Sequence, residues 1–242
     1  MGTFAQNPYA IPVAEAGVDE RVAFLRKVGL WTSLGLLVAG VTSVLSAGAV
    51  VVVPALQNQW VSIAIMLGSI FAAQYVGRSL VSRADAQSQT LGFFLGTALE
   101  GVAMGYLILT ATILSIQVYA NPIMFIAQAL GLVGLTILGM IAYLMTGPRQ
   151  LNWIGAGLAT LGIPMLILMV VSFVFPIGGT IGLLISVAFV VLSAGGLLYN
   201  LNLVIHQMST NMVIPGAYHI TLGILTLFWN VLVLLMRLQD RR

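Results

Sequence analysis

The stretch from Gly92 to Leu109, GFFLGTALEGVAMGYLIL, decides the class of fold. It is apolar or small throughout except for Glu100, and a run of about 20 such residues is long enough for a helix to cross a bilayer. Two glycine pairs with four-residue spacing stand around the acid: Gly92 with Gly96, and Gly101 with Gly105. Small residues at this spacing let helices approach closely in lipid. Because residues 92, 96 and 100 share a helix face, we expect Glu100 to point toward neighbouring helices.

The composition of the whole chain agrees with that stretch. Of 242 residues, 60% are hydrophobic and 6% are charged, whereas a soluble domain carries roughly 25% charged residues. So few charges exclude a soluble enzyme or a nucleic-acid-binding module, and a net charge of +3 is no basis for binding nucleic acid. The chain has no Cys, which excludes disulfides and thiolate metal sites.

Apolar runs of membrane-spanning length predict an all-α integral membrane protein with seven spans. The breaks between the runs hold turn residues such as Pro54, Asn121 and Pro148. The expected spans are 28–53, 60–80, 90–114, 122–145, 151–175, 179–201 and 218–238. We predict that residues 1–20 form a polar N-terminal tail and that residues 21–242 form the membrane bundle.

The distribution of Lys and Arg predicts the orientation, since cytoplasmic loops carry the excess of these residues. A cytoplasmic N-terminus puts six of them inside: Arg21, Arg26, Lys27, Arg78, Arg83 and Arg149. The outer loops at 54–59, 115–121 and 176–179 then hold no Lys or Arg. Seven spans place the C-terminus outside with Arg237, Arg241 and Arg242, which is the one feature against the rule.

Glu100 is the single acid within a predicted span, and such residues are usually functional. It is either a proton- or cation-responsive carboxyl in a polar cavity or a protonated side chain that holds helices together. Polar stripes on the last two spans have the same two interpretations, and packing is the commoner one. The stripes are Ser186, Ser193, Asn200 and Gln207 on one span, and Gly223, Thr226, Asn230 and Arg237 on the next. His206 and His219 flank the last loop without carboxylate support, so we expect no metal and no cofactor.

Four segments resemble the bacterial branch of the Bax inhibitor-1-like family. They are ERVAFLRKVGLW (Glu20–Trp31), the stretch Gly92–Leu109, GLLYNLNLVI (Gly196–Ile205) and LTLFWNVLVLLMRL (Leu225–Leu238). The third resembles the family's Leu-Tyr-Asp motif with Asn200 in the Asp position, and Asn230 and Arg237 match a typical Asn and Arg of the closing helix. The resemblance implies a seven-helix bundle in the bacterial inner membrane with the C-terminal helix at its centre.

For some family members the resemblance implies a pH-sensitive calcium leak controlled by two aspartates. This chain has Asn200 at the first of those positions and Leu227 at the second, with Thr226 beside it. Neither side chain titrates near neutral pH, and Glu100 alone is a poor site for a hard divalent cation. Another bacterial branch that also lacks the acid pair is associated with an AAA-type membrane protease, which its members bind and restrain.

Three functions follow from these observations. The leading hypothesis is a non-enzymatic inner-membrane protein that binds and modulates a membrane protein complex, with the tail 1–20 as the point of attachment. The second is a proton or calcium leak channel or transporter that uses Glu100, with Asn200, Thr226, Asn230 and Arg237 as further candidates for its polar core. A membrane-embedded enzyme is third, because the sequence holds no Ser–His pair, paired Asp or H-E-x-x-H motif.

Overall fold

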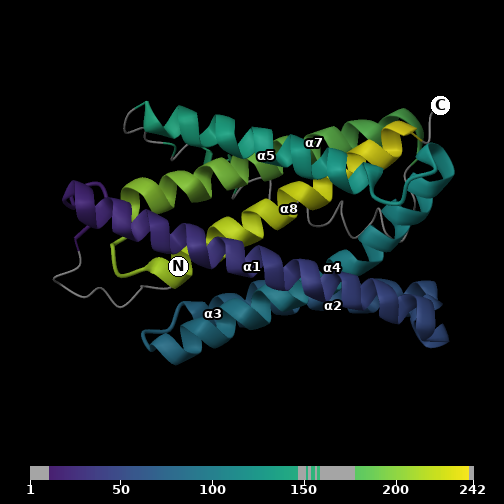
Figure 1. Cartoon of the computed structure of the whole chain (residues 1–242), viewed down its shortest axis with the longest axis horizontal. Coiled ribbons are helices and arrows are strands. Elements are labelled where there is room, and N and C mark those ends of the chain that lie inside the picture. The colour runs from purple at the N-terminus through teal and green to yellow at the C-terminus, as the bar shows by residue number, and fades with distance from the viewer. Residues whose placement is uncertain (1–10, 147–150, 152–153, 156, 159–177, 240–242) are drawn as a thin grey trace. The chain divides into compact units, whose positions relative to one another are not determined.

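The computed structural model describes residues 11–146, 151, 154–155, 157–158 and 178–239, and helices make up its elements (Figure 1). Six helices of the described part are long and apolar enough to cross a membrane: Val18–Val52, Gln59–Val81, Ala86–Tyr119, Met124–Met145, Gly179–Gln207 and Val213–Gln239. They coincide with six of the predicted spans. The other predicted span, 151–175, lies almost entirely outside the described residues.

The chain divides into two compact units. Unit 1 is Met1–Leu109 with Leu203–Leu222, and unit 2 is Thr110–Asn202 with Gly223–Arg242. Each unit is described by itself below.

Unit 1 begins with α1 (Val18–Val52), which at 35 residues extends well beyond its predicted apolar run. A rise of 1.5 Å per residue gives α1 a length of about 52 Å, more than the roughly 30 Å of hydrocarbon in a bilayer. The helix starts in the polar segment because Asp19 and Glu20 suit the positive end of a helix dipole. It stops before Pro54, which opens the 3-10 helix η1 (Pro54–Gln57).

The second span of unit 1 has three parts: α2 (Gln59–Ala72), the π-helix η2 (Ala73–Gly77) and α3 (Arg78–Val81). Asn58 caps its start, because the side-chain oxygen accepts hydrogen bonds from the backbone N–H groups of Trp60 at 3.0 Å and Val61 at 3.4 Å. The rest of unit 1 consists of the first part of α4 (Ala86–Tyr119), the π-helix η3 (Leu203–Gln207) and the start of α8 (Val213–Gln239).

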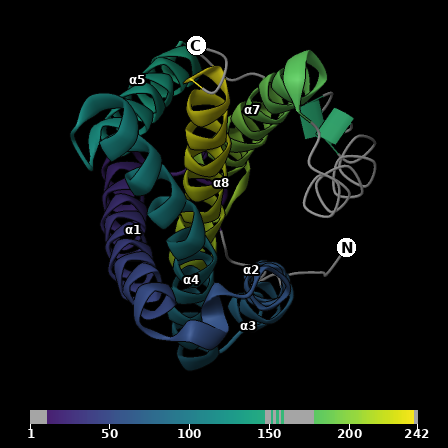
Figure 2. The same cartoon turned by 90° about the vertical axis from the view of Figure 1, so that its right-hand side faces the viewer.

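The glycines of α4 allow the close packing within unit 1. A Cβ on Gly101 would lie 2.9 Å from the Ala39 Cα of α1, and one on Gly92 would lie 2.6 Å from the Leu80 Cβ of α3. Figure 2 shows α4 between α1 and the α2–α3 stretch, in agreement with these contacts. Any side chain at these two positions would push the helices apart, so glycine is required for the observed spacing.

Unit 2 contains α5 (Met124–Met145), α7 (Gly179–Asn202) and the remaining parts of α4 and α8. The turn between α4 and α5 passes through Ala120, which has a φ of 53°. Ser115 stabilises that turn: its hydroxyl donates to the Asn121 carbonyl at 2.5 Å and accepts from the Met124 N–H at 3.1 Å. Tyr119 and Phe125 add an edge-to-face ring contact at 5.3 Å.

Candidate functional site

Glu100 lies in the core of unit 1, where the glycine spacing of α4 predicts it. Its side chain is 6% exposed. The Gln74 amide of η2 donates to its Oε1 at 3.2 Å, so a neutral amide bonds to the carboxyl. An amide partner satisfies an acceptor on a buried carboxyl without introducing a second charge that must also be desolvated.

The π-helix η2 is what positions Gln74. A π-helix forms hydrogen bonds between residues i and i+5 in place of i and i+4, so it changes the direction of the side chains that follow. The carbonyl of Ala73, the first residue of η2, accepts a hydrogen bond from the Tyr218 hydroxyl of α8 at 2.7 Å. Tyr218 therefore fixes the backbone next to the residue that bonds Glu100.

Two glycines surround the Tyr218 ring. A Cβ on Gly96 would lie 2.6 Å from its Cε2, and a Cβ on Gly77 would lie 3.2 Å from its Cζ. Phe93 packs edge-on against the same ring at 6.3 Å, and Tyr218 is 1% exposed. Glycine at 77 and 96 thus provides the space for a large aromatic side chain whose hydroxyl reaches η2.

This arrangement limits the chemistry available at the site. It offers one carboxyl, one amide and one phenol that is already engaged as a donor, whereas Ca²⁺ takes six to eight oxygen ligands. No group of three or more His, Cys, Asp or Glu residues that could hold a metal ion occurs in the part of the chain that the structure describes. The site is suited to holding one proton or to fixing helices in register.

The other four predicted residues belong to unit 2. The Arg237 guanidinium of α8 donates to the Gly182 carbonyl of α7. A Cβ on Gly223 of α8 would lie 3.0 Å from the Leu197 Cδ1 and 3.4 Å from the Asn200 Nδ2, so this part of α8 packs against Asn200. Thr226 is exposed and Asn230 is half-buried. Arg237 and Asn200 therefore take part in contacts between α7 and α8 within unit 2.

The sequence was compared with family models, with curated proteins and with solved structures. The model of the family described as inhibitor of apoptosis-promoting Bax1, abbreviated Bax1-I, matches residues 21–240. The chain belongs to the Bax1-I family. No curated protein and no solved structure matches it.

Membership of the Bax1-I family agrees with the resemblance found in the sequence and with a multi-pass membrane protein. In this Bax1-I protein the two positions of the implied acid pair hold Asn200, which is half-buried, and Leu227, which is 1% exposed. A buried leucine contributes packing and no titratable group. Glu100 is the one acid within the spans predicted from the sequence.

Two residues of the Glu100 site, Gln74 and Tyr218, were not predicted from the sequence. Gln74 is the single amide side chain between residues 60 and 80, which marks it as a polar group in need of a partner. Tyr218 carries no comparable signal, because a tyrosine at the start of a span also fits the aromatic belt of a membrane protein.

Proposed function

We propose that this Bax1-I family protein is a non-enzymatic inner-membrane protein that binds and modulates a membrane protein complex such as an AAA-type membrane protease. The observation that carries the proposal is the buried Leu227 at a position of the implied acid pair. A modulator of this kind needs a stable bundle and a surface for its partner, and it needs no titrating pair.

The proposal includes the finer topology. The bundle has seven spans, with the remaining span at 151–175, and the C-terminal helix is central. The burial of α8 supports the central position, since 44% of its apolar window is buried, the largest share of the six helices. The absence of Lys and Arg in the outer loops supports a cytoplasmic N-terminus in a bacterial inner membrane.

Reconstitution with a purified membrane protease of the AAA type tests the proposal. We expect the full chain to co-purify with the protease in mild detergent and to slow its degradation of a membrane substrate. Deletion of residues 1–10 should abolish both effects, while the variant Val18→Ala, at an exposed position of α1, should retain them. A full chain that always emerges alone and leaves the protease rate unchanged would contradict the proposal.

A second candidate function is a proton or calcium leak through Glu100. The buried carboxyl with its single amide partner favours it, because an intramembrane acid is by default a functional group. In liposomes, Glu100→Gln should lower proton or calcium flux several-fold, since the amide keeps the size of the side chain but cannot exchange a proton. Thr136→Val, at a half-buried position of α5 where the hydroxyl bonds the Leu132 carbonyl of its own helix, is the matched control. Equal flux through wild type and Glu100→Gln would exclude this function.

A further inference from the structure

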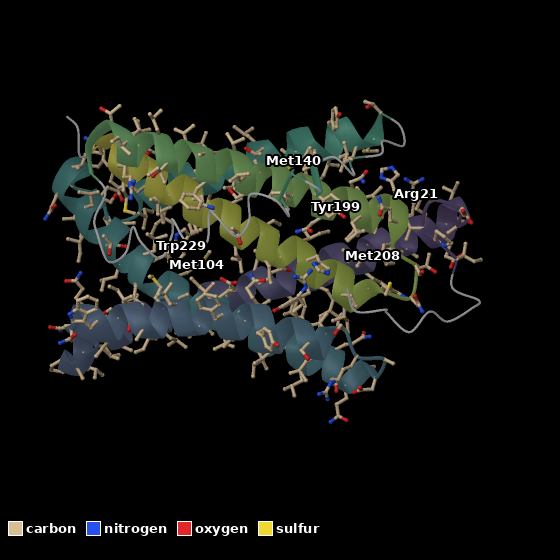
Figure 3. The ribbon with its side chains drawn as sticks, turned by 180° about the vertical axis from the view of Figure 1, so that it is seen from behind. Arg21, Met104, Met140, Tyr199, Met208 and Trp229 are labelled. Carbon is tan, nitrogen blue, oxygen red and sulfur yellow. The ribbon has the colours of Figure 1, made fainter. Side chains whose placement is uncertain are left out.

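Residues 11–16 are attached to the segment that precedes α8, almost 200 residues away in sequence. Pro12 and Ser209 form an antiparallel β-bridge. The Val13 N–H donates to the Met208 carbonyl at 2.8 Å, and the Thr210 N–H donates to the Ile11 carbonyl at 3.3 Å. Figure 3 shows Met208 and Arg21 of α1 lying toward the same end of unit 1. We call residues 11–16 the strap and residues 208–212 the strap loop.

The residues of the strap suit this contact. The two hydrogen bonds flank the paired residues, so Pro12 and Ser209 form a pair whose own N–H groups take no part in the bridge. Pro12 lacks an N–H and therefore loses nothing there. Its carbonyl accepts from the N–H groups of Glu15 at 2.9 Å and Ala16 at 3.1 Å, which turns the chain toward α1.

Two side chains add to the backbone contact. Val13 is 0% exposed, so the strap buries a complete apolar side chain within unit 1. The Thr210 hydroxyl donates to the Glu20 carboxylate of α1 at 2.9 Å, which gives the strap loop a second attachment to the same region. The contact thus combines backbone pairing, apolar burial and a hydrogen bond to a charged group.

We propose that the strap is an intramolecular competitor for the partner of the N-terminal tail: a protein that grips this tail as an extended peptide must first detach residues 11–16 from the strap loop. The inference rests on the proposed function for the identity of the partner. Recognition of an extended peptide uses its backbone N–H and carbonyl groups together with alternate side chains. In the strap those groups already bond Met208 and Thr210, and Val13 is already buried.

The competition has a structural consequence for the start of α8. The strap loop ends at residue 212 and α8 begins at Val213, with the Gly216 N–H donating back to the Met212 carbonyl at 3.0 Å. Tyr218, which bonds the Ala73 carbonyl of η2, follows within the first two turns. Detachment of the strap therefore removes a restraint from the helix that fixes the Glu100 site.

An engineered disulfide tests the strap directly, and the natural chain has no cysteine to interfere. Residues in a pair of this kind have Cα atoms about 4.5 Å apart, within the range that a disulfide bridges. We expect Pro12→Cys with Ser209→Cys to oxidise readily in the full chain in detergent. The control is Val13→Cys with Ser209→Cys, in which the first cysteine is shifted by one residue. This pair should not oxidise, because the side chain at position 13 points to the opposite face of the strap from that at position 12. No cross-link in the first pair, or equal cross-linking in both pairs, would contradict the contact between the strap and the strap loop.

Partial detachment should be measurable by hydrogen exchange of the Thr210 amide. Val13→Asp should speed exchange roughly tenfold or more, because it removes a buried apolar side chain from the contact. Val18→Asp, at a position that is 79% exposed, is the matched control and should leave exchange unchanged. Equal exchange in wild type and Val13→Asp would show that the burial of Val13 does not hold the strap.

The competition itself is tested with the disulfide pair and the membrane protease. Binding of the protease to the reduced pair but not to the oxidised pair supports the proposal. Equal binding in both states would overturn the competition while the proposed function stands. Binding to neither the reduced pair nor the wild type would overturn the proposed function and the competition with it, and the cross-linking result would still report the strap contact.

Discussion

In unit 1, the Tyr218 hydroxyl and the Gln74 amide form hydrogen bonds between helices, whereas the Thr136 and Ser186 hydroxyls of unit 2, like the Thr97 and Thr221 hydroxyls of unit 1, bond to their own helix. Tyr218 reaches Ala73 and Gln74 reaches Glu100 in unit 1. In unit 2, Thr136 and Ser186 each bond the carbonyl four residues earlier; those bonds are Thr136 to Leu132 and Ser186 to Gly182. A hydroxyl bonded within its own helix specifies no neighbour, while a bond between helices does.

The glycines differ in the same way. Within the described residues, the α4 glycines in unit 1 have α1, α3 or the Tyr218 ring of α8 within the space of a Cβ, whereas a Cβ on Gly131, Gly134 or Gly139 of α5 would have nothing within 4 Å. Similar glycine-rich spans therefore serve different purposes. In unit 1 they position a polar core, whereas α5 gains no close contact from its own glycines among the described residues.

The largest expected effect comes from adding one methyl group to a glycine of each unit. Gly101→Ala should destabilise the protein by about 3 kcal/mol or more, because its Cβ would lie within 3.0 Å of three α1 atoms, among them the Ala39 Cα at 2.9 Å, a backbone atom that cannot rotate away. Gly134→Ala should be neutral or stabilise by up to about 1 kcal/mol, the gain in helix propensity. Unfolding by titration from micelles into SDS, followed by circular dichroism, measures both. Equal effects would remove the contrast between the units.

A smaller effect is expected from the polar contacts. Gln74→Leu should cost about 1–3 kcal/mol, because it leaves a buried carboxyl without its donor. Its counterpart in unit 2, Thr136→Val, should stay within about 0.5 kcal/mol, since the carbonyl it bonds keeps its helical partner. The same SDS titration applies. As a further control, Gln74→Leu combined with Glu100→Leu should recover part of the loss, because both partners are then apolar.

The sequence predicted the parts of this architecture that follow from hydrophobicity and periodicity. Six of the expected spans are confirmed as helices, and the shared face of Gly92, Gly96 and Glu100 is buried as expected. Periodicity determines which face a residue occupies, but it does not determine which helix faces it.

For that reason the partners of Glu100 could not be predicted. Gln74 faces the carboxyl through a π-helix, and no local sequence signal marks where an α-helix widens by one residue. The bridge between Pro12 and Ser209 was also not predicted, because the contact spans almost the whole chain and involves one residue pair. Long-range pairing of this kind depends on tertiary structure that a pattern of residue types does not contain.

The smallest expected effect concerns the helix starts of the two units. The Asp85 carboxylate caps α4, whereas α5 has no side-chain cap and the Asn121 amide bonds in the turn before it. The Asp85 carboxylate accepts from the Ser88 N–H at 2.8 Å, while the Asn121 side-chain oxygen accepts from the Ile123 N–H at 3.1 Å. Hydrogen bonds from the Ser88 hydroxyl and backbone hold the pKa of Asp85 below its usual value of 3.8. A lowered pKa means that the cap contributes stability fully above pH 3.8 and loses it as the pH falls through the folded value.

Amide chemical shifts measured across an acid titration should therefore distinguish the two helix starts. The Ser88 amide resonance should move with a midpoint below pH 3.8, and the Ile123 amide resonance should stay in place, because Asn121 has no proton to gain. Asp85→Asn, which keeps an acceptor at the same position, should abolish the movement at Ser88. A Ser88 midpoint at or above pH 3.8 would mean that the Asp85 cap does not favour the charged carboxylate, and the difference between the two helix starts would then not be electrostatic.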